Sequence, residues 1–145
     1  WNRSIEELLP HVRPLFAVLI RQLLEHGIYV AVVSFSPQTK VIRDTLQKIL
    51  PEYVDKIVIQ AKDQSFENQA GSELRDGKLK YMAAAVTEIT KCLLSPGQNV
   101  EITRASSLLI DDDKKNVEIS LNSFIRALLF DPANPLSVLE DMTEF

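Results

Sequence analysis

Three consecutive aspartates, Asp111, Asp112 and Asp113, are the residues of this chain best suited to chemistry. They follow the apolar residues 106–110, whose composition predicts a buried strand. A strand that ends on carboxylates delivers them to the carboxyl edge of a sheet, where open α/β folds bind ligands. Carboxylates gathered there repel one another unless a cation faces them, and Mg²⁺ prefers such oxygen ligands. The alternative is an acidic cap on the following helix, because Asp in a first turn favours the helix dipole.

Helices and strands alternate along the rest of the chain. Apolar residues recur at helical spacing from Pro14 until Gly27, a residue suited to end a helix. Residues 61–77 are polar and predict a long loop, functional or mobile. Predicted helices cover residues 14–27, 37–50, 78–94, 117–123 and 135–142, and predicted strands cover residues 28–33, 56–60, 107–110 and 125–130.

Short apolar strands joined by helices predict an α/β fold with a Rossmann-like parallel sheet and helices on both faces. The ends of parallel strands meet at one edge, so Ser34 should lie near Asp111 and Asp112 there. Lys78 begins a predicted helix whose amino end can reach the same edge. A hydroxyl, a cation and paired carboxylates are the groups needed to hold a phosphoryl group beside Mg²⁺.

At these residues the chain resembles the haloacid dehalogenase superfamily, most of whose members are Mg²⁺-dependent phosphohydrolases. The stretch VRPLFAVLIRQLLEHGIYVAVVSFSPQTKVIRDTL is similar to the family's second motif with its flanking helices, DGKLKYMAAA to the third motif, and SSLLIDDDKKNVEIS to the fourth. The resemblance covers residues 12–132. It implies that Ser34 and Lys78 bind the phosphoryl oxygens and that Asp111 and Asp112 hold Mg²⁺.

The family's nucleophile is missing from these residues. It is the first Asp of a D-x-D motif on a strand that precedes the others, and the D-x-D of this chain is Asp111 to Asp113. In the family that strand lies between the strand before Ser34 and the strand before Asp111, and its loss would leave two apolar edges unpaired. We therefore expect one α/β domain over residues 1–145, incomplete on its N-terminal side, with the missing strand supplied by an upstream segment or another chain.

Two functions follow from the resemblance. The first is a Mg²⁺-dependent phosphatase that hydrolyses a phosphoester through an aspartyl-phosphate, with a phosphorylated small molecule or a phosphoprotein as substrate. The second is a catalytically inactive pseudoenzyme that serves as a binding or interaction module.

Composition argues against several other classes of protein. A net charge of -4 without basic clusters argues against a nucleic-acid partner. No apolar run approaches the roughly 20 residues of a membrane span. A single cysteine, Cys92, excludes a disulfide framework within the chain and favours a reducing, cytoplasmic compartment.

For several residues the sequence leaves more than one role open. Lys80 competes with Lys78 for the phosphate role, and either could be a solvated helix lysine. Ser36 is expected to cap the helix that begins at Pro37. Asn116 either supports the acidic cluster or lies exposed on its helix. Cys92 is expected to pack in the core.

Overall fold

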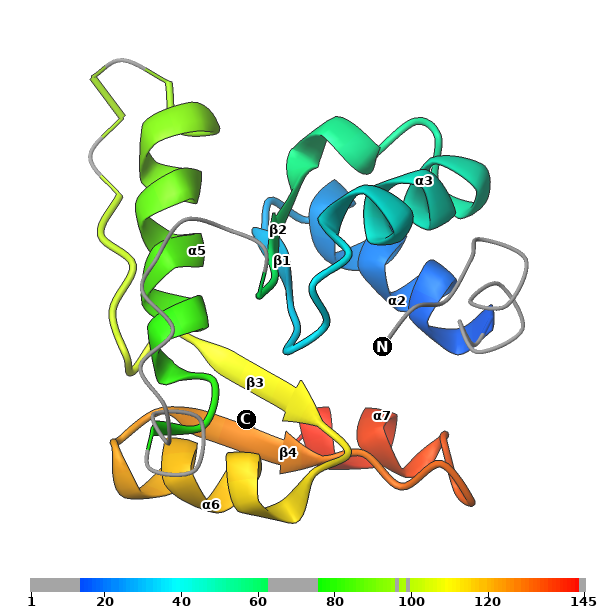
Figure 1. The fold of residues 1–145 in the computed structure, drawn as a ribbon, viewed down its shortest axis with the longest axis vertical. Helices are drawn as coiled ribbons and strands as arrows, with labels where there is room; N and C mark the ends of the chain where they lie inside the picture. The colour runs from blue at the N-terminus through cyan, green and yellow to red at the C-terminus, as the bar shows by residue number, and fades with distance from the viewer. Residues whose placement is uncertain (1–13, 63–75, 96, 99, 144–145) are drawn as a thin grey trace. The chain divides into compact units, whose positions relative to one another are not determined.

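The structure is a computed structural model that describes residues 14–62, 76–95, 97–98 and 100–143. It is a mixed α/β arrangement of short parallel strand pairs and helices, shown in Figure 1. The chain divides into two compact units. Unit 1 comprises Trp1–Asn68 and Tyr81–Pro96, and unit 2 comprises Gln69–Lys80 and Gly97–Phe145.

Unit 1 is built on two parallel strands, β1 (Val30–Val33) and β2 (Ile57–Gln60). Both are rich in β-branched residues, which favour extended backbone. They align with Val30 opposite Ile57 and Val33 opposite Gln60. The strands are joined through helix α3 (Thr39–Ile49) and the 3₁₀ turn η2 (Val54–Lys56), as the alternating pattern predicts.

The core of unit 1 lies between β2 and its helices. Buried residues of α3, η2 and β2 form one cluster, and helix α2 (Pro14–Glu25) packs against it. Gly27, with φ +76°, ends α2 where the sequence predicts. The cluster comprises Leu46, Leu50, Val54, Ile57 and Ile59, with Ala17, Ile20 and Leu24 of α2 against it.

Burial differs between the two strands of unit 1. All residues of β2 are buried, whereas all residues of β1 are only half-buried. Strand β1 also begins at Val30, later than predicted, and Ile28 before it is 51% exposed. Ile28 instead donates its backbone N–H to Leu23 in the turn after α2, which removes it from the strand.

Unit 2 is built on the parallel strands β3 (Leu108–Asp111) and β4 (Arg126–Leu129), joined by helix α6 (Lys114–Asn122). Helix α6 packs on both strands, and the short helix α7 (Ser137–Met142) packs on β4 (Figure 1). Helix α6 begins earlier than predicted because Asp113 caps it. Phe124, in the turn before β4, has φ +63° and is 85% exposed.

Helix α5 (Leu79–Cys92) carries Leu79 and Lys80 in unit 2 and its remaining residues in unit 1. The predicted loop 61–77 falls mostly on residues 63–75, which lie outside the described residues. Parallel pairing and helical connections are confirmed, whereas one continuous sheet with helices on both faces stays a prediction. Within the described residues, no helix has both the length and the apolar character needed to cross a membrane.

Candidate functional site

A buried ion pair lies at the carboxyl end of β3. Asp111 is the last residue of that strand, and alternation along the strand buries it on the same face as Leu109. Its Oδ2 lies 2.7 Å from Nζ of Lys78, and the two side chains are 3% and 16% exposed. The structure therefore brings together two of the residues that the sequence singled out, although they are far apart in the chain.

Two further hydrogen-bond donors contact the Asp111 carboxylate. The backbone N–H of Asp113 donates to Oδ1 at 2.9 Å, and Nδ2 of Asn116 donates to Oδ2 at 3.3 Å. Burial by itself raises the pKa of Asp111, but the hydrogen bonds from Lys78 and Asp113 and the charge of Lys78 lower it more. The net pKa of Asp111 is below its usual value, so the carboxylate is ionised at neutral pH.

Gly77 is what allows Lys78 to reach this position. Its φ is +54°, a conformation that side chains with a Cβ rarely adopt, and it is buried. A Cβ there would lie 3.2 Å from Oδ1 of Asn116 and 3.2 Å from Cδ1 of Ile119. Gly77 is not among the residues singled out above from the sequence, although a glycine directly before a candidate lysine is a visible signal of close backbone approach.

The three aspartates take three different positions. Asp111 is buried and paired, whereas Asp112 is exposed. Asp113 caps α6, because its Oδ1 accepts the backbone N–H of Lys115 at 2.9 Å. The alternative reading of the cluster as a helix cap is thus correct for Asp113 alone.

The structure also separates the two candidate lysines. Lys80 lies 4.0 Å from the Asp76 carboxylate, one turn away on the same segment, and is 42% exposed. Lys78 instead contacts the acidic cluster. Asn116, which the sequence left open, is buried and bonded to that cluster.

Ser34 directly follows β1 in unit 1. Its backbone N–H donates to the carbonyl of Gln60 at 3.0 Å, and its Oγ accepts the N–H of Ser36 at 3.1 Å. Ser34 and the Lys78–Asp111 pair belong to different units. Their convergence on one edge stays a prediction.

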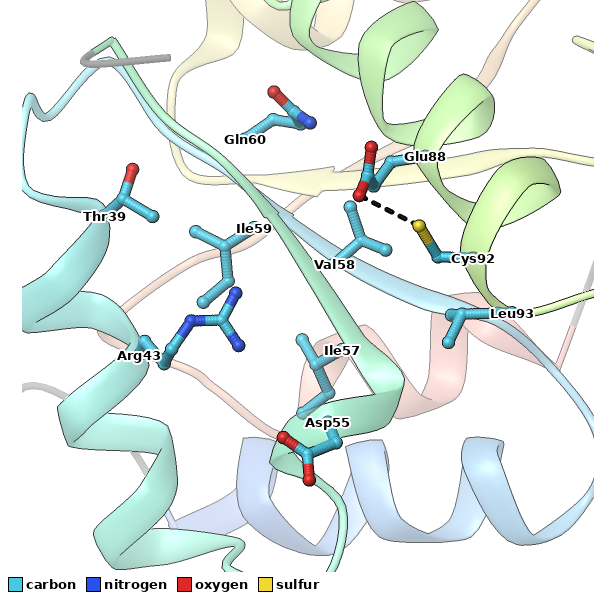
Figure 2. Close-up of a pocket in the computed structure, with 10 residues that line it drawn as sticks. All are labelled: Thr39, Arg43, Asp55, Ile57, Val58, Ile59, Gln60, Glu88, Cys92 and Leu93. Atoms are coloured by element: carbon cyan, nitrogen blue, oxygen red, sulfur yellow. Dashed lines mark hydrogen bonds between the residues drawn. The ribbon is translucent and has the colours of Figure 1, made fainter.

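Two sequence expectations in unit 1 are wrong. Ser36 does not cap α3, because that helix begins at Thr39 after Gln38 and no side chain caps it. The Ser36 hydroxyl is buried and has no hydrogen-bond partner among the described residues. Cys92 is exposed rather than packed in the core, and its thiol donates to Oε1 of Glu88 at 3.2 Å (Figure 2).

Asp111 and Asp112 would supply at most part of a Mg²⁺ ligand set. A carboxylate offers about four acceptor positions, and the contacts above use three on Asp111. Exposed Asp112 adds a second carboxylate, and Mg²⁺ is commonly held by one or two carboxylates together with water and phosphate oxygens. Among the described residues, no group of three or more His, Cys, Asp or Glu side chains could hold a metal. Further ligands would come from substrate, from water or from residues outside the described ranges.

Comparison of the chain with protein-family models, with curated proteins and with solved structures gave no match.

Proposed function

We propose that this chain carries the phosphoryl-binding and magnesium-binding residues of a phosphohydrolase of the haloacid dehalogenase type. The buried pair between Lys78 and Asp111 is the observation that supports this most. A cation held at the end of a parallel strand, next to the exposed carboxylate of Asp112, suits a doubly charged phosphoryl group and its metal. An acidic helix cap alone would not require a lysine from a distant segment.

The strand pairing also supports the proposal. The pairs β1–β2 and β3–β4 are both parallel, as in a Rossmann-like sheet with helices on both faces. Among the described residues, β1 and β3 each have one edge without a strand partner. In our proposal a further strand pairs there and supplies the nucleophilic Asp of a D-x-D motif, either from an upstream segment or from another chain. The half-burial of β1 is consistent with a missing neighbour.

Each residue has a distinct part in the proposed reaction, which hydrolyses a phosphoester through an aspartyl-phosphate. Ser34 would donate its hydroxyl hydrogen to a phosphoryl oxygen, since its Oγ already accepts the N–H of Ser36. Lys78 can bridge Asp111 and a phosphoryl oxygen, because an ammonium group has three donors. Asp111 and Asp112 would hold Mg²⁺, which supplies positive charge opposite the transferring group.

The substrate class we propose is a phosphorylated small molecule or a phosphoprotein. The alternative function is a pseudoenzyme that binds phosphorylated ligands without turnover. One observation favours that alternative: the chain has no D-x-D besides Asp111 to Asp113, and Asp111 is already paired with Lys78.

The experiment compares two lysine variants of the complete polypeptide. Mg²⁺-dependent hydrolysis of a panel of phosphoesters is measured for the wild type, for Lys78→Met and for Lys80→Met. Both substitutions remove one charge near the start of α5, but only Lys78 contacts Asp111. Loss of one such charge-stabilising donor lowers kcat by about 10²–10³ fold. We expect that loss for Lys78→Met and near wild-type kcat for Lys80→Met.

Two outcomes would contradict the phosphatase proposal. One is equal turnover in the two variants. The other is no turnover by the wild type, and in that case Mg²⁺-dependent binding of inorganic phosphate, lost in Lys78→Met alone, would support the pseudoenzyme.

A further inference from the structure

Two aromatic rings connect the loop after β1 to helix α5. The ring centroids of Phe35 and Tyr81 lie 5.4 Å apart, at an interplanar angle of 68°. In this edge-to-face arrangement, aromatic rings attract each other beyond the effect of their buried area. Phe35 directly follows Ser34, and Tyr81 is the third residue of α5; both rings belong to unit 1. The contact therefore holds the loop that carries Ser34 against the first turn of α5.

The hydrophobic core of unit 1 does not account for this contact. Among the described residues, neither ring belongs to the cluster of α3, η2 and β2 or to the residues that pack against it. Tyr81 is nevertheless only 3% exposed, and Phe35 is half-buried. Connecting segments usually run over the surface, and they often carry functional residues. The ring of Phe35 instead ties its loop to a buried ring of a helix.

Hydrogen bonds fix the backbone of the same loop to the chain around the end of β2. The N–H of Ser34 donates to the carbonyl of Gln60 at 3.0 Å, and the N–H of Lys62 donates to the carbonyl of Ser36 at 2.9 Å. The N–H of Ser36 donates to Oγ of Ser34 at 3.1 Å, which orients that hydroxyl. The ring of Phe35 adds the connection from this fixed loop to α5.

Tyr81 is close in the chain to the lysine of the candidate site. Lys78 directly precedes α5 and lies three positions before Tyr81, and three helical residues rise by about 4.5 Å. Lys78 in turn contacts Asp111 at 2.7 Å. The ring contact therefore links the placement of Lys78 to that of the Ser34 hydroxyl. An error of about 1 Å in the placement of reacting groups can cost about 10² fold in rate.

We propose that Phe35 and Tyr81 are positioning residues, which set the Ser34 hydroxyl and the Lys78 ammonium group at the separation where both bind one phosphoryl group. This inference rests on the proposed function, and it gives the rings no contact with substrate. Aromatic side chains suit the task because they are large and rigid, with only two side-chain torsions. Leucine at either position would keep an apolar side chain but would lose the edge-to-face contact.

The test measures binding of inorganic phosphate to the complete polypeptide in the presence of Mg²⁺, by isothermal titration calorimetry. Phe35→Leu and Tyr81→Leu each remove one ring. Loss of an edge-to-face pair changes an equilibrium constant by about 2–10 fold, and loss of the binding-competent arrangement weakens the apparent affinity accordingly. We expect each leucine variant to bind phosphate about fivefold more weakly than the wild type. Phe35→Tyr keeps a ring and should bind phosphate as the wild type does.

Two comparisons separate positioning from a general loss of stability. Tyr53→Leu removes an aromatic side chain that packs against the core of unit 1 next to η2, before β2 begins. It should lower Tm but leave phosphate affinity unchanged. The double variant Phe35→Leu with Tyr81→Leu should bind phosphate as weakly as either single variant, because both substitutions remove the same contact. Two independent packing losses would instead add.

The outcomes distinguish failure of this inference from failure of the proposed function. Wild-type phosphate affinity in both leucine variants, while Lys78→Met loses binding, would overturn the positioning role and leave the proposed function standing. An equal loss of affinity in Tyr53→Leu would do the same. Absence of phosphate binding by the wild type, or binding that Lys78→Met does not change, would overturn the proposed function and this inference with it.

Discussion

Removal of Lys78 should destabilise the protein more than removal of its partner. Lys78→Met leaves Asp111 ionised at 3% exposure, with Asn116 and the Asp113 N–H as remaining donors among the described residues. Breaking a buried ion pair from one side costs about 3–5 kcal/mol. Because these two donors remain, we expect about 3 kcal/mol. For a domain of this size the loss lowers Tm by about 6–12 °C.

Asp111→Asn should cost less, about 1–2 kcal/mol, because Lys78 is 16% exposed and can still reach water. The sequence alone suggests the opposite, since replacing one of three adjacent carboxylates should relieve repulsion. That expectation does not hold in the structure, because the ammonium group of Lys78 already compensates the charge of Asp111. The double variant should be more stable than the sum of the two single losses predicts, by about 1–2 kcal/mol, because the two residues interact directly.

The pH dependence of the stability loss in Lys78→Met tests whether the unpaired Asp111 carboxylate causes it. The pKa of Asp111 is lowered in the folded protein, so its stabilising contribution is complete above the unfolded value of about 3.9 and is lost as pH falls through the folded pKa. In Lys78→Met, burial dominates and raises that pKa, so acidification neutralises a destabilising charge. Urea unfolding should show a smaller difference between variant and wild type at pH 4 than at pH 7. A difference below about 0.5 kcal/mol at pH 7, or one independent of pH, would refute this reasoning.

Two further substitutions test local features of unit 2. Ser120→Ala should stabilise the protein by about 1 kcal/mol in urea unfolding, because the Ser120 hydroxyl is fully buried and has no hydrogen-bond partner among the described residues; a loss of stability would mean that this hydroxyl is bonded. Phe124→Gly should raise stability by about 0.5–1 kcal/mol, because glycine adopts φ +63° without strain and the 85% exposed ring contributes little packing. A decrease in Tm would show that the ring is packed against a part of the protein outside the described residues.

The sequence predicts the elements well where its pattern depends on local chemistry. Gly27 ends α2, and the β-branched residues of β2 form a strand, because backbone preference decides both. Helix starts are less well predicted. Ser36 and Asp113 look like equally good caps, yet only Asp113 bonds to the helix that follows it. That choice depends on the path of the loop, which the residue types do not determine.

The candidate site is predicted in part. Residue type and position identify Asp111 and Lys78, because a lysine near a helix start and an aspartate after a strand suit one edge of an α/β fold. The support from Asn116 and the close approach at Gly77 depend on how α6 packs against a distant segment. No periodicity in the sequence carries that information. The exposure of Cys92 likewise depends on which face of α5 is covered.

The pairing of β3 with β4 has a consequence for the order of folding. Leu108 aligns with Arg126 across a short crossover through α6, so this pair closes a small loop. The contact between Lys78 and Asp111 closes a longer loop, whose entropic cost is met later on the folding path. We therefore expect the ion pair to form after the transition state of folding and to slow unfolding. Its loss would appear mainly as faster unfolding, with the refolding rate little changed.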